Sequence, residues 1–271
     1  MGSHVGNDDE MTVLVTGFGP FREQYPVNPS YEIAKSLPAY LPALAAPPSK
    51  AGADTAPLPI PETRILVHPE PIRVNYQRVR ALVPSLWDEP MPGEAGGEGE
   101  EAAWHGRTID AAVHIGMAGP RQVYQVERRA HRRGYRRADV DGETLAEDED
   151  AEDWRWRDYP DELETNIDVD DVLKRWKGHS PKHLNLRISE DAGRYLCDFI
   201  YYSSLSHLWA RGRPRKVVFL HVPADASEKA VARGTALAVS LIRSIVESET
   251  LSRAGERGKA QDARVAREFA A

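Results

Sequence analysis

Cysteine is almost absent from this sequence: Cys197 is the only one among 271 residues. A single cysteine excludes a disulfide framework and favours a reducing compartment, so we expect a cytoplasmic protein. Long apolar runs are absent too. No stretch approaches the roughly 18 residues that a membrane span needs, and the N-terminal stretch lacks the apolar core of a signal peptide. Positive charge is not in excess, and the net charge of −7 argues against a nucleic-acid partner.

Metal-binding motifs are also missing. The histidines show no H-E-x-x-H spacing, and the chain has no Cys-x-x-Cys pair. The histidines considered as ligands are His105, His114, His131, His179, His183, His207 and His221. We therefore expect neither a metal ion nor a cofactor.

Short apolar segments alternate with segments of helical periodicity along the chain. Strands are predicted at 12–16, 64–68, 111–116, 122–127, 183–188 and 216–221, and helices at 28–37, 74–87, 169–176, from 194 onward and at 227–249. This alternation predicts one three-layer α/β/α domain over residues 11–250 with a mostly parallel, mixed sheet. Too few residues separate 111–116 from 122–127 for a parallel crossover. These strands are therefore expected to form a hairpin, or the second is expected to leave the main sheet.

Several polar stretches interrupt this pattern. Residues 38–62, 88–107 and 139–168 are expected to be solvated insertions, and 139–168 is strongly acidic. Residues 1–10 resemble an expression tag or a flexible N-terminus, and 251–271 are expected to form a charged, flexible tail.

Cys197 lies in the stretch on which the functional interpretation depends. Residues 191–193 form a predicted turn between a strand and a helix, with Asp191 as a candidate N-cap. A helix that starts just after Gly193 places Cys197 in or near its first turn. There the helix dipole and the unpaired N–H groups stabilise a thiolate. The alternative is a small buried side chain, which is the commoner role of an isolated cysteine.

Two other strand ends carry groups that a thiol enzyme needs. His221 closes an apolar strand before Pro223, and Glu127 ends another strand. In a parallel sheet, ligands bind beyond the carboxyl ends of the strands. The residues alone leave a structural role for His221 and a solvated role for Glu127 open.

Several sequence blocks occur together in the order seen in one enzyme family. They are residues 13–21, 28–30, 114–116, 126–128, 189–205 and 219–223, and the run Asp191-Ala-Gly-Arg-Tyr-Leu-Cys-Asp198 is the longest and most specific. In these blocks the chain resembles the pyroglutamyl peptidase I (pyrrolidone carboxyl peptidase) family of cysteine peptidases. The resemblance spans most of residues 12–223.

The resemblance implies a catalytic triad and a substrate pocket. Cys197 would be the nucleophile, His221 the acid and base, and Glu127 the group that orients His221. Phe18 and Phe21 would sandwich the pyroglutamyl lactam, with Asn28 as a polar contact; core packing is the alternative for both phenylalanines. The substrate implied is a peptide with an N-terminal L-pyroglutamyl residue, and the oligomeric state is left undetermined.

Two features depart from the family pattern. His131 stands where bacterial members usually carry Asn, shortly after the Glu. Arg137 lies at about the spacing of an Arg that supports the oxyanion in some members, but the basic run around it weakens this alignment. The backbone N–H of Cys197 is therefore the better-founded oxyanion donor.

Two rival interpretations belong to other classes. Residues 17–19 could be a phosphate-binding loop, but Pro20 follows and no third glycine or helix start is present. The chain could instead be a catalytically silent scaffold that binds partners through its acidic insertion.

Overall fold

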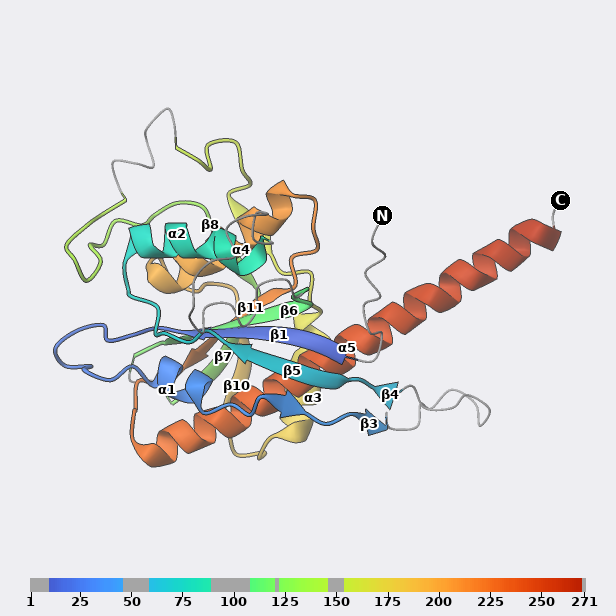
Figure 1. Ribbon diagram of the computed structural model, residues 1–271, viewed down its shortest axis with the longest axis horizontal. Coiled ribbons are helices and arrows are strands. Elements are labelled where there is room, and N and C mark those ends of the chain that lie inside the picture. Colours follow the sequence, from blue (N-terminus) through green and yellow to red (C-terminus); the bar gives the residue numbers. More distant parts are fainter. Residues whose placement is uncertain (1–9, 46–58, 89–107, 120–121, 146–153, 270–271) are drawn as a thin grey trace, which may run out of the picture.

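A seven-stranded sheet forms the centre of the computed structural model, which describes residues 10–45, 59–88, 108–119, 122–145 and 154–269. The strand order is β10-β7-β11-β6-β1-β5-β2 (Figure 1). Its strands are β1 (Glu10–Gly17), β2 (Tyr40–Leu41), β5 (Glu62–Val67), β6 (Ala111–Met117), β7 (Tyr124–Glu127), β10 (Leu186–Ser189) and β11 (Val217–Val222). β5, β1, β6 and β11 are mutually parallel, β7 is antiparallel to β11, and β2 is antiparallel to β5. The predicted mixed, mostly parallel sheet is confirmed.

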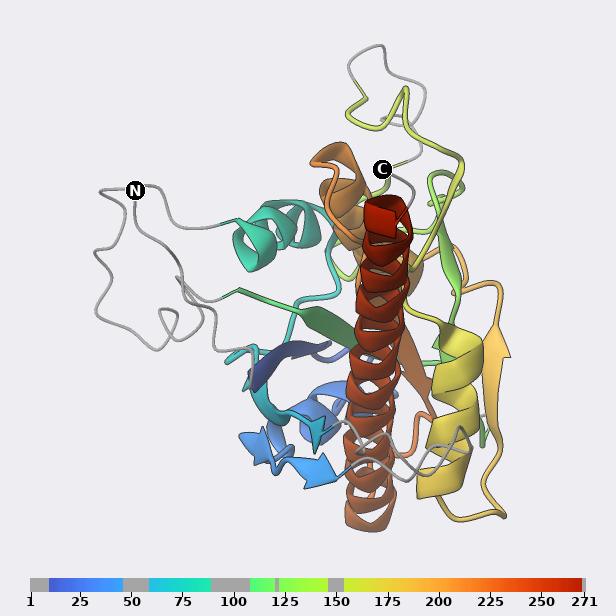
Figure 2. The ribbon, with the colours of Figure 1, turned by 90° about the vertical axis from the view of Figure 1, so that its right-hand side faces the viewer.

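Helices cover both faces of the sheet (Figures 1 and 2). On one face α2 (Tyr76–Trp87) packs beside α4 (Leu196–Ala210), and on the other α5 (Glu228–Phe269) packs against α1 (Pro29–Lys35) and α3 (Val169–His179). The alternation of β1 explains this arrangement: Val13 and Val15 belong to the core under α1, α3 and α5, whereas Leu14 belongs to the core under α2 and α4. The three-layer α/β/α prediction is confirmed.

The prediction for the strand at 122–127 is wrong in both of its forms. β7 neither forms a hairpin with β6 nor leaves the main sheet. β11, about 90 residues later in the chain, lies between them and pairs with both. Local spacing could not indicate this, because the strand that separates the two comes from a distant part of the sequence.

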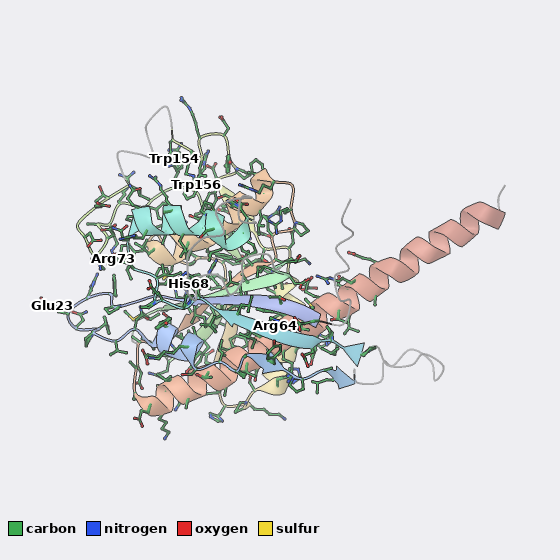
Figure 3. The ribbon with its side chains drawn as sticks, in the orientation of Figure 1. Glu23, Arg64, His68, Arg73, Trp154 and Trp156 are labelled. Carbon is green, nitrogen blue, oxygen red and sulfur yellow. The ribbon has the colours of Figure 1, made fainter. Side chains whose placement is uncertain are left out.

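The insertion predicted at 139–168 contributes to the core where the structure describes it. Trp154 and Trp156 are 6% and 2% exposed, on the α2–α4 side of the sheet (Figure 3). Trp156 packs on Phe199 and Tyr202 of α4, with ring centroids 5.3 and 4.8 Å apart. Farther along, β9 (Glu162–Glu164) pairs with β8 (Arg129–His131). The expectation of a fully solvated excursion is therefore wrong, because aromatic side chains anchor the segment.

Other boundaries also differ from the sequence predictions. Within 38–62, β2 extends the sheet and β3 (Leu44–Ala45) pairs with β4 (Pro59–Ile60), whereas 46–58 lie outside the described residues. α5 continues from Glu228 to Phe269, past the predicted end at 249. The predicted tag at 1–10 and the insertion at 88–107 fall almost wholly outside the described residues. In the described part of the chain, no helix is long and apolar enough to cross a membrane.

Replacing Trp156 tests the anchoring of the insertion. Trp156→Ala should lower the free energy of unfolding by about 3–5 kcal/mol, the usual cost of truncating a buried large aromatic. Urea denaturation followed by circular dichroism measures this. Trp209→Ala is the matched control. Because Trp209 is 37% exposed, this variant should lose much less free energy of unfolding. Equal small losses for both variants would contradict the anchoring role.

Candidate active site

Cys197 is the second residue of α4, inside the first helical turn as predicted. The N-cap is Tyr195, however, and not Asp191. Asp191 instead accepts hydrogen bonds from the backbone N–H of Gly193 (2.9 Å) and from Arg194. The turn at 191–195 therefore extends farther than the sequence indicates, and Gly193 adopts the φ of +89° that this turn requires.

The N-terminus of α4, next to Cys197, has no side-chain cap. Tyr195 makes no side-chain capping hydrogen bond, and the backbone N–H of Phe199 donates to Tyr195 O at 2.9 Å to close the first turn. The earlier N–H groups of a helix have no acceptor within it. These donors, together with the positive end of the helix dipole, stabilise negative charge at the half-buried Cys197.

His221 and Glu127 meet across two neighbouring strands, β11 and β7, on the β10 side of the sheet. The antiparallel register of β11 and β7 pairs Phe219 with Glu127 and His221 with Gln125. His221 and Glu127 are therefore diagonal neighbours on the face that α4 covers. His221 Nδ1–H donates to Glu127 Oε1 at 2.7 Å, and the two residues are 5% and 0% exposed.

The surroundings of His221 favour its protonated form. Burial alone lowers the pKa of an imidazole, but the charge of Cys197, a hydrogen bond with Cys197, and the hydrogen bond and charge of Glu127 act in the opposite direction. Together they raise the pKa of His221 from 6.5 to about 10. Cys197, His221 and Glu127, predicted from three separate segments, are thus brought into one chain of contacts.

His114, the other histidine next to an expected site motif, has the opposite surroundings. It is fully buried beneath α4, between Thr16 Oγ1 (2.7 Å) and Ser204 Oγ (2.9 Å). Burial, with a smaller effect from His68, lowers the pKa of His114 to about 3. It is therefore neutral and joins β1, β6 and α4 as a structural group.

Gly116 makes room for Cys197, a function that sequence reasoning did not assign to it. It lies opposite His221 in the register of β6 and β11. A Cβ at this position would lie 3.0 Å from Cys197 Sγ and 2.6 Å from the ring of Phe219. A residue with a side chain would therefore displace the thiol or the aromatic ring.

The loop after β1 lies close to this site. Phe18 is 3% exposed and packs in the core, and its backbone forms an isolated parallel β-bridge with Ile72. Phe21 is partly exposed, and its ring centroid lies 5.4 Å from that of Tyr195, two residues before Cys197. Phe21 is thus beside the start of α4, whereas the contacts of Phe18 are those of a core residue.

Asn28 and Gly17 hold this loop in place. The Asn28 amide donates to Gly19 O at 2.9 Å, and its oxygen accepts from the backbone N–H and the hydroxyl of Ser30. Asn28 thus caps α1, and its role as a substrate contact stays a prediction. A Cβ on Gly17 would lie 2.6 Å from Tyr31 Cα, so the packing of α1 accounts for this glycine without a phosphate.

The two departures from the family pattern have defined positions. The Arg137 guanidinium lies 4.9 Å from the ring centroid of Tyr195. His131 binds the fully buried Asp198, with its backbone N–H and Nδ1 each 3.2 Å from a carboxylate oxygen. The hydroxyl of Tyr135 donates to the same carboxylate at 2.8 Å. His131 therefore ties β8 to the first turn of α4, and the oxyanion role of Arg137 stays a prediction.

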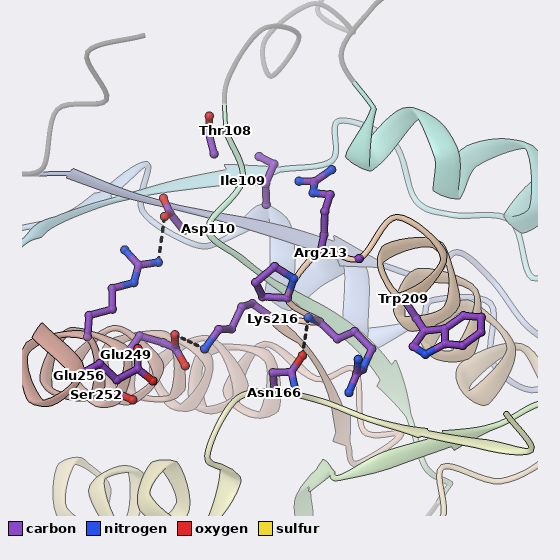
Figure 4. A pocket seen from close by; sticks show the side chains of 14 residues that line it. Thr108, Ile109, Asp110, Asn166, Trp209, Arg213, Lys216, Glu249, Ser252 and Glu256 are labelled. Atoms are coloured by element: carbon purple, nitrogen blue, oxygen red, sulfur yellow. Dashed lines mark hydrogen bonds and ion pairs between the residues drawn. The ribbon is translucent and has the colours of Figure 1, made fainter. Parts of the chain in front are cut away.

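A separate cavity of about 940 Å³ lies at the other end of the strands from the candidate site, where β6 and β11 begin (Figure 4). Ion pairs cross it: Lys216 to Glu249 (2.5 Å) and Arg253 to Asp110 (3.2 Å). Neither cysteine nor histidine lines it. The cavity therefore holds neither the thiol nor the imidazole on which the candidate site depends. Within the described residues there is also no cluster of His, Cys, Asp and Glu that could hold a metal ion.

Comparison with known proteins agrees with this geometry. A family model described as pyroglutamyl peptidase matches residues 99–251, more than half of the chain. Pyroglutamyl-peptidase 1 of Rattus norvegicus is 32% identical over 216 residues, covering 78% of each chain. The chain belongs to the pyroglutamyl peptidase family. It is 30% identical to Pyroglutamyl-peptidase 1 of Homo sapiens over the same length and coverage.

Solved structures support the fold. The pyrrolidone carboxyl peptidase of Pyrococcus furiosus superimposes with a TM-score of 0.59 at 20% identity, covering 88% of this chain and 99% of that one. Such coverage means that nearly the whole of the compact archaeal fold has a counterpart here.

Alkylation tests the coupling between Cys197 and His221 without any substrate. Iodoacetamide reacts with thiolates, and a protonated His221 stabilises the Cys197 thiolate. At pH 6, His221→Ala should therefore react at about a tenth of the wild-type rate or less, measured by mass spectrometry of the modified protein. His183→Ala is the control, because His183 is exposed and should leave the rate unchanged. An undiminished rate in His221→Ala would contradict the coupling.

Proposed function

We propose that this protein is a cysteine exopeptidase that hydrolyses an N-terminal L-pyroglutamyl residue from peptides. The observation that carries the proposal is the joining of Cys197, His221 and Glu127 at one place from α4, β11 and β7. A thiolate, an imidazole and an orienting carboxylate are the groups that nucleophilic acyl transfer requires. Family membership supports the reaction class, and the three side chains are the groups that would carry out the reaction.

The first half-reaction forms a thioester. The Cys197 thiolate attacks the carbonyl carbon that joins pyroglutamate to the next residue, and the carbonyl oxygen becomes an oxyanion. The backbone N–H groups of the first turn of α4 are placed to receive this charge. Protonated His221 donates its proton to the leaving nitrogen, the C–N bond breaks, and the shortened peptide departs as an amine.

The second half-reaction restores the enzyme. His221, now neutral, accepts a proton from a water molecule, and the resulting hydroxide attacks the thioester carbonyl. The C–S bond breaks, pyroglutamate leaves, and the pair of Cys197 thiolate and protonated His221 is regenerated. Glu127 fixes the ring of His221 through Nδ1.

Specificity follows from the absence of charge on the pyroglutamyl group. Its lactam nitrogen carries no positive charge, unlike an ordinary peptide N-terminus. A pocket built from Phe21 and the loop after β1 would accept the uncharged ring, whereas a charged amine would lose its hydration without gaining a partner. Phe18 would contribute from the core side of the same loop, with Asn28 supporting its backbone.

Release of a fluorescent amine from an L-pyroglutamyl amide tests the proposed activity. The wild-type protein should turn over this substrate, and Cys197→Ala should lower kcat/KM by at least about 10³-fold, because the nucleophile is lost. An L-prolyl amide is the matched control substrate, since its ring carries a charged amine, and it should not be cleaved. A folded, reduced wild-type protein without turnover would overturn the proposal and favour the silent scaffold.

The pH profile tests the role of Glu127. His221 acts in its protonated form and its pKa is raised to about 10, so wild-type kcat/KM should fall only as the pH rises through that region. Glu127→Gln removes a negative charge that stabilises the protonated ring. The alkaline limb should therefore move down by about 1 to 3 pH units. An unchanged limb would show that Glu127 does not set the protonation of His221.

A further inference from the structure

Glu127 receives a second hydrogen bond that the triad does not account for. The side-chain amide of Gln125 donates to Glu127 Oε1 at 2.8 Å, the same oxygen that accepts from His221. The other oxygen, Oε2, is buried and has no hydrogen-bond partner among the described residues. Both bonds that fix this carboxylate therefore meet on one atom, and Gln125 supplies one of them.

The sheet register places Gln125 in line with the candidate catalytic groups. Gln125 pairs with His221 on one side and with Arg187 of β10 on the other. Gln125 and Glu127 are two residues apart on β7, so their side chains lie on the same face of the sheet. One row across four strands thus reads Arg187, Gln125, His221 and Gly116.

Arg187 decides which way the Gln125 amide points. Its Nε and Nη2 donate to Gln125 Oε1 at 3.0 and 2.7 Å. A guanidinium has only donors, so it must face the amide oxygen. The amide NH₂ is then directed at Glu127, and the reversed orientation would place two acceptors against each other. Arg187 is exposed at the surface, whereas Gln125 is 8% exposed.

We propose that Gln125, oriented by Arg187, is a positioning residue that holds Glu127 against His221 and so keeps His221 aligned with Cys197. The proposal rests on the proposed peptidase function. Without Gln125, the carboxylate would be held by His221 alone and could rotate to present Oε2. The imidazole would then lose its fixed direction toward Cys197, which affects the reaction rate more than substrate binding, because none of these groups lies in the pocket described above.

Kinetics of three variants test whether Arg187 and Gln125 position Glu127. Gln125→Met keeps the length of the side chain and removes its donor, and should lower kcat by about 10-fold or more with KM changed less than about twofold. Arg187→Met should lower kcat by a smaller factor, about threefold, because Gln125 remains but can turn. The double variant should match Gln125→Met alone, since Arg187 acts only through Gln125. Lys182→Met, an exposed charge in the same segment, should behave as wild type.

Iodoacetamide alkylation of Cys197 provides a second readout that needs no substrate. The rates at pH 6 should fall in the same order as kcat. Wild-type kcat and alkylation rate in Gln125→Met, or a change in KM alone, would overturn the proposal while leaving the peptidase function intact. If the wild type shows no turnover, the proposed function fails, and the alkylation rates alone decide whether Gln125 positions Glu127. If Gln125→Met does not fold, the exposed Arg187→Met variant decides it by the same two measurements.

Discussion

The hydrogen bond between Glu127 and His221 joins two ionisable groups that are almost fully removed from water. Burying either charge alone would be costly, so each needs the other as a partner. β7 runs antiparallel beside β11, and in the observed register its last residue, Glu127, lies diagonal to His221. The strand order at this edge of the sheet is thus the arrangement that assembles the carboxylate and the imidazole.

The third group comes from a different layer. The N-terminus of α4, which has no side-chain cap, lies beside His221. The Cys197 thiol in its first turn therefore contacts the imidazole. Two features allow this approach: Gly116 leaves space beneath the thiol, and Asp198 anchors the first turn to His131 and Tyr135. Burial raises the pKa of Asp198, against the effect of these hydrogen bonds. The buried carboxylate of Asp198, next to Cys197 in the chain, thus has a structural role, whereas Glu127 faces His221.

The success of sequence reasoning varied with the range of the interactions involved. β1 has an apolar centre at residues 13–15 and β11 is apolar apart from His221, and the alternation of such strands with helices predicts three layers without further information. The relation of β7 to β6 could not be predicted, because β11 lies between them and no local pattern shows it. The composition around Trp154 and Trp156 does not indicate that they anchor the segment, because acidic residues dominate it. The residue type of Asp191 predicts an N-cap, but its carboxylate accepts from Gly193 within the turn before α4 instead.

The site shows the same division. Cys197, His221 and Glu127 could be selected from strand and helix ends and from a family resemblance, since each lies in a recognisable block. The position of Gln125 could have indicated a role near the site, because it stands two residues before Glu127 and so lies on the same face of the strand. Arg187 offered none, because its partner depends on the register between β10 and β7. Residue type and local spacing thus identify candidate groups, and only the sheet register shows which of them meet.

The most direct test of the central claim is a crystal structure of the protein with the aldehyde analogue of L-pyroglutamate. Addition of the Cys197 thiol across the aldehyde C=O bond gives a hemithioacetal that resembles the tetrahedral intermediate. We expect continuous density from Cys197 Sγ to the former aldehyde carbon, the lactam ring beside Phe21, and His221 still hydrogen-bonded to Glu127. An analogue bound elsewhere, or left unreacted with its carbonyl away from Cys197, would contradict it.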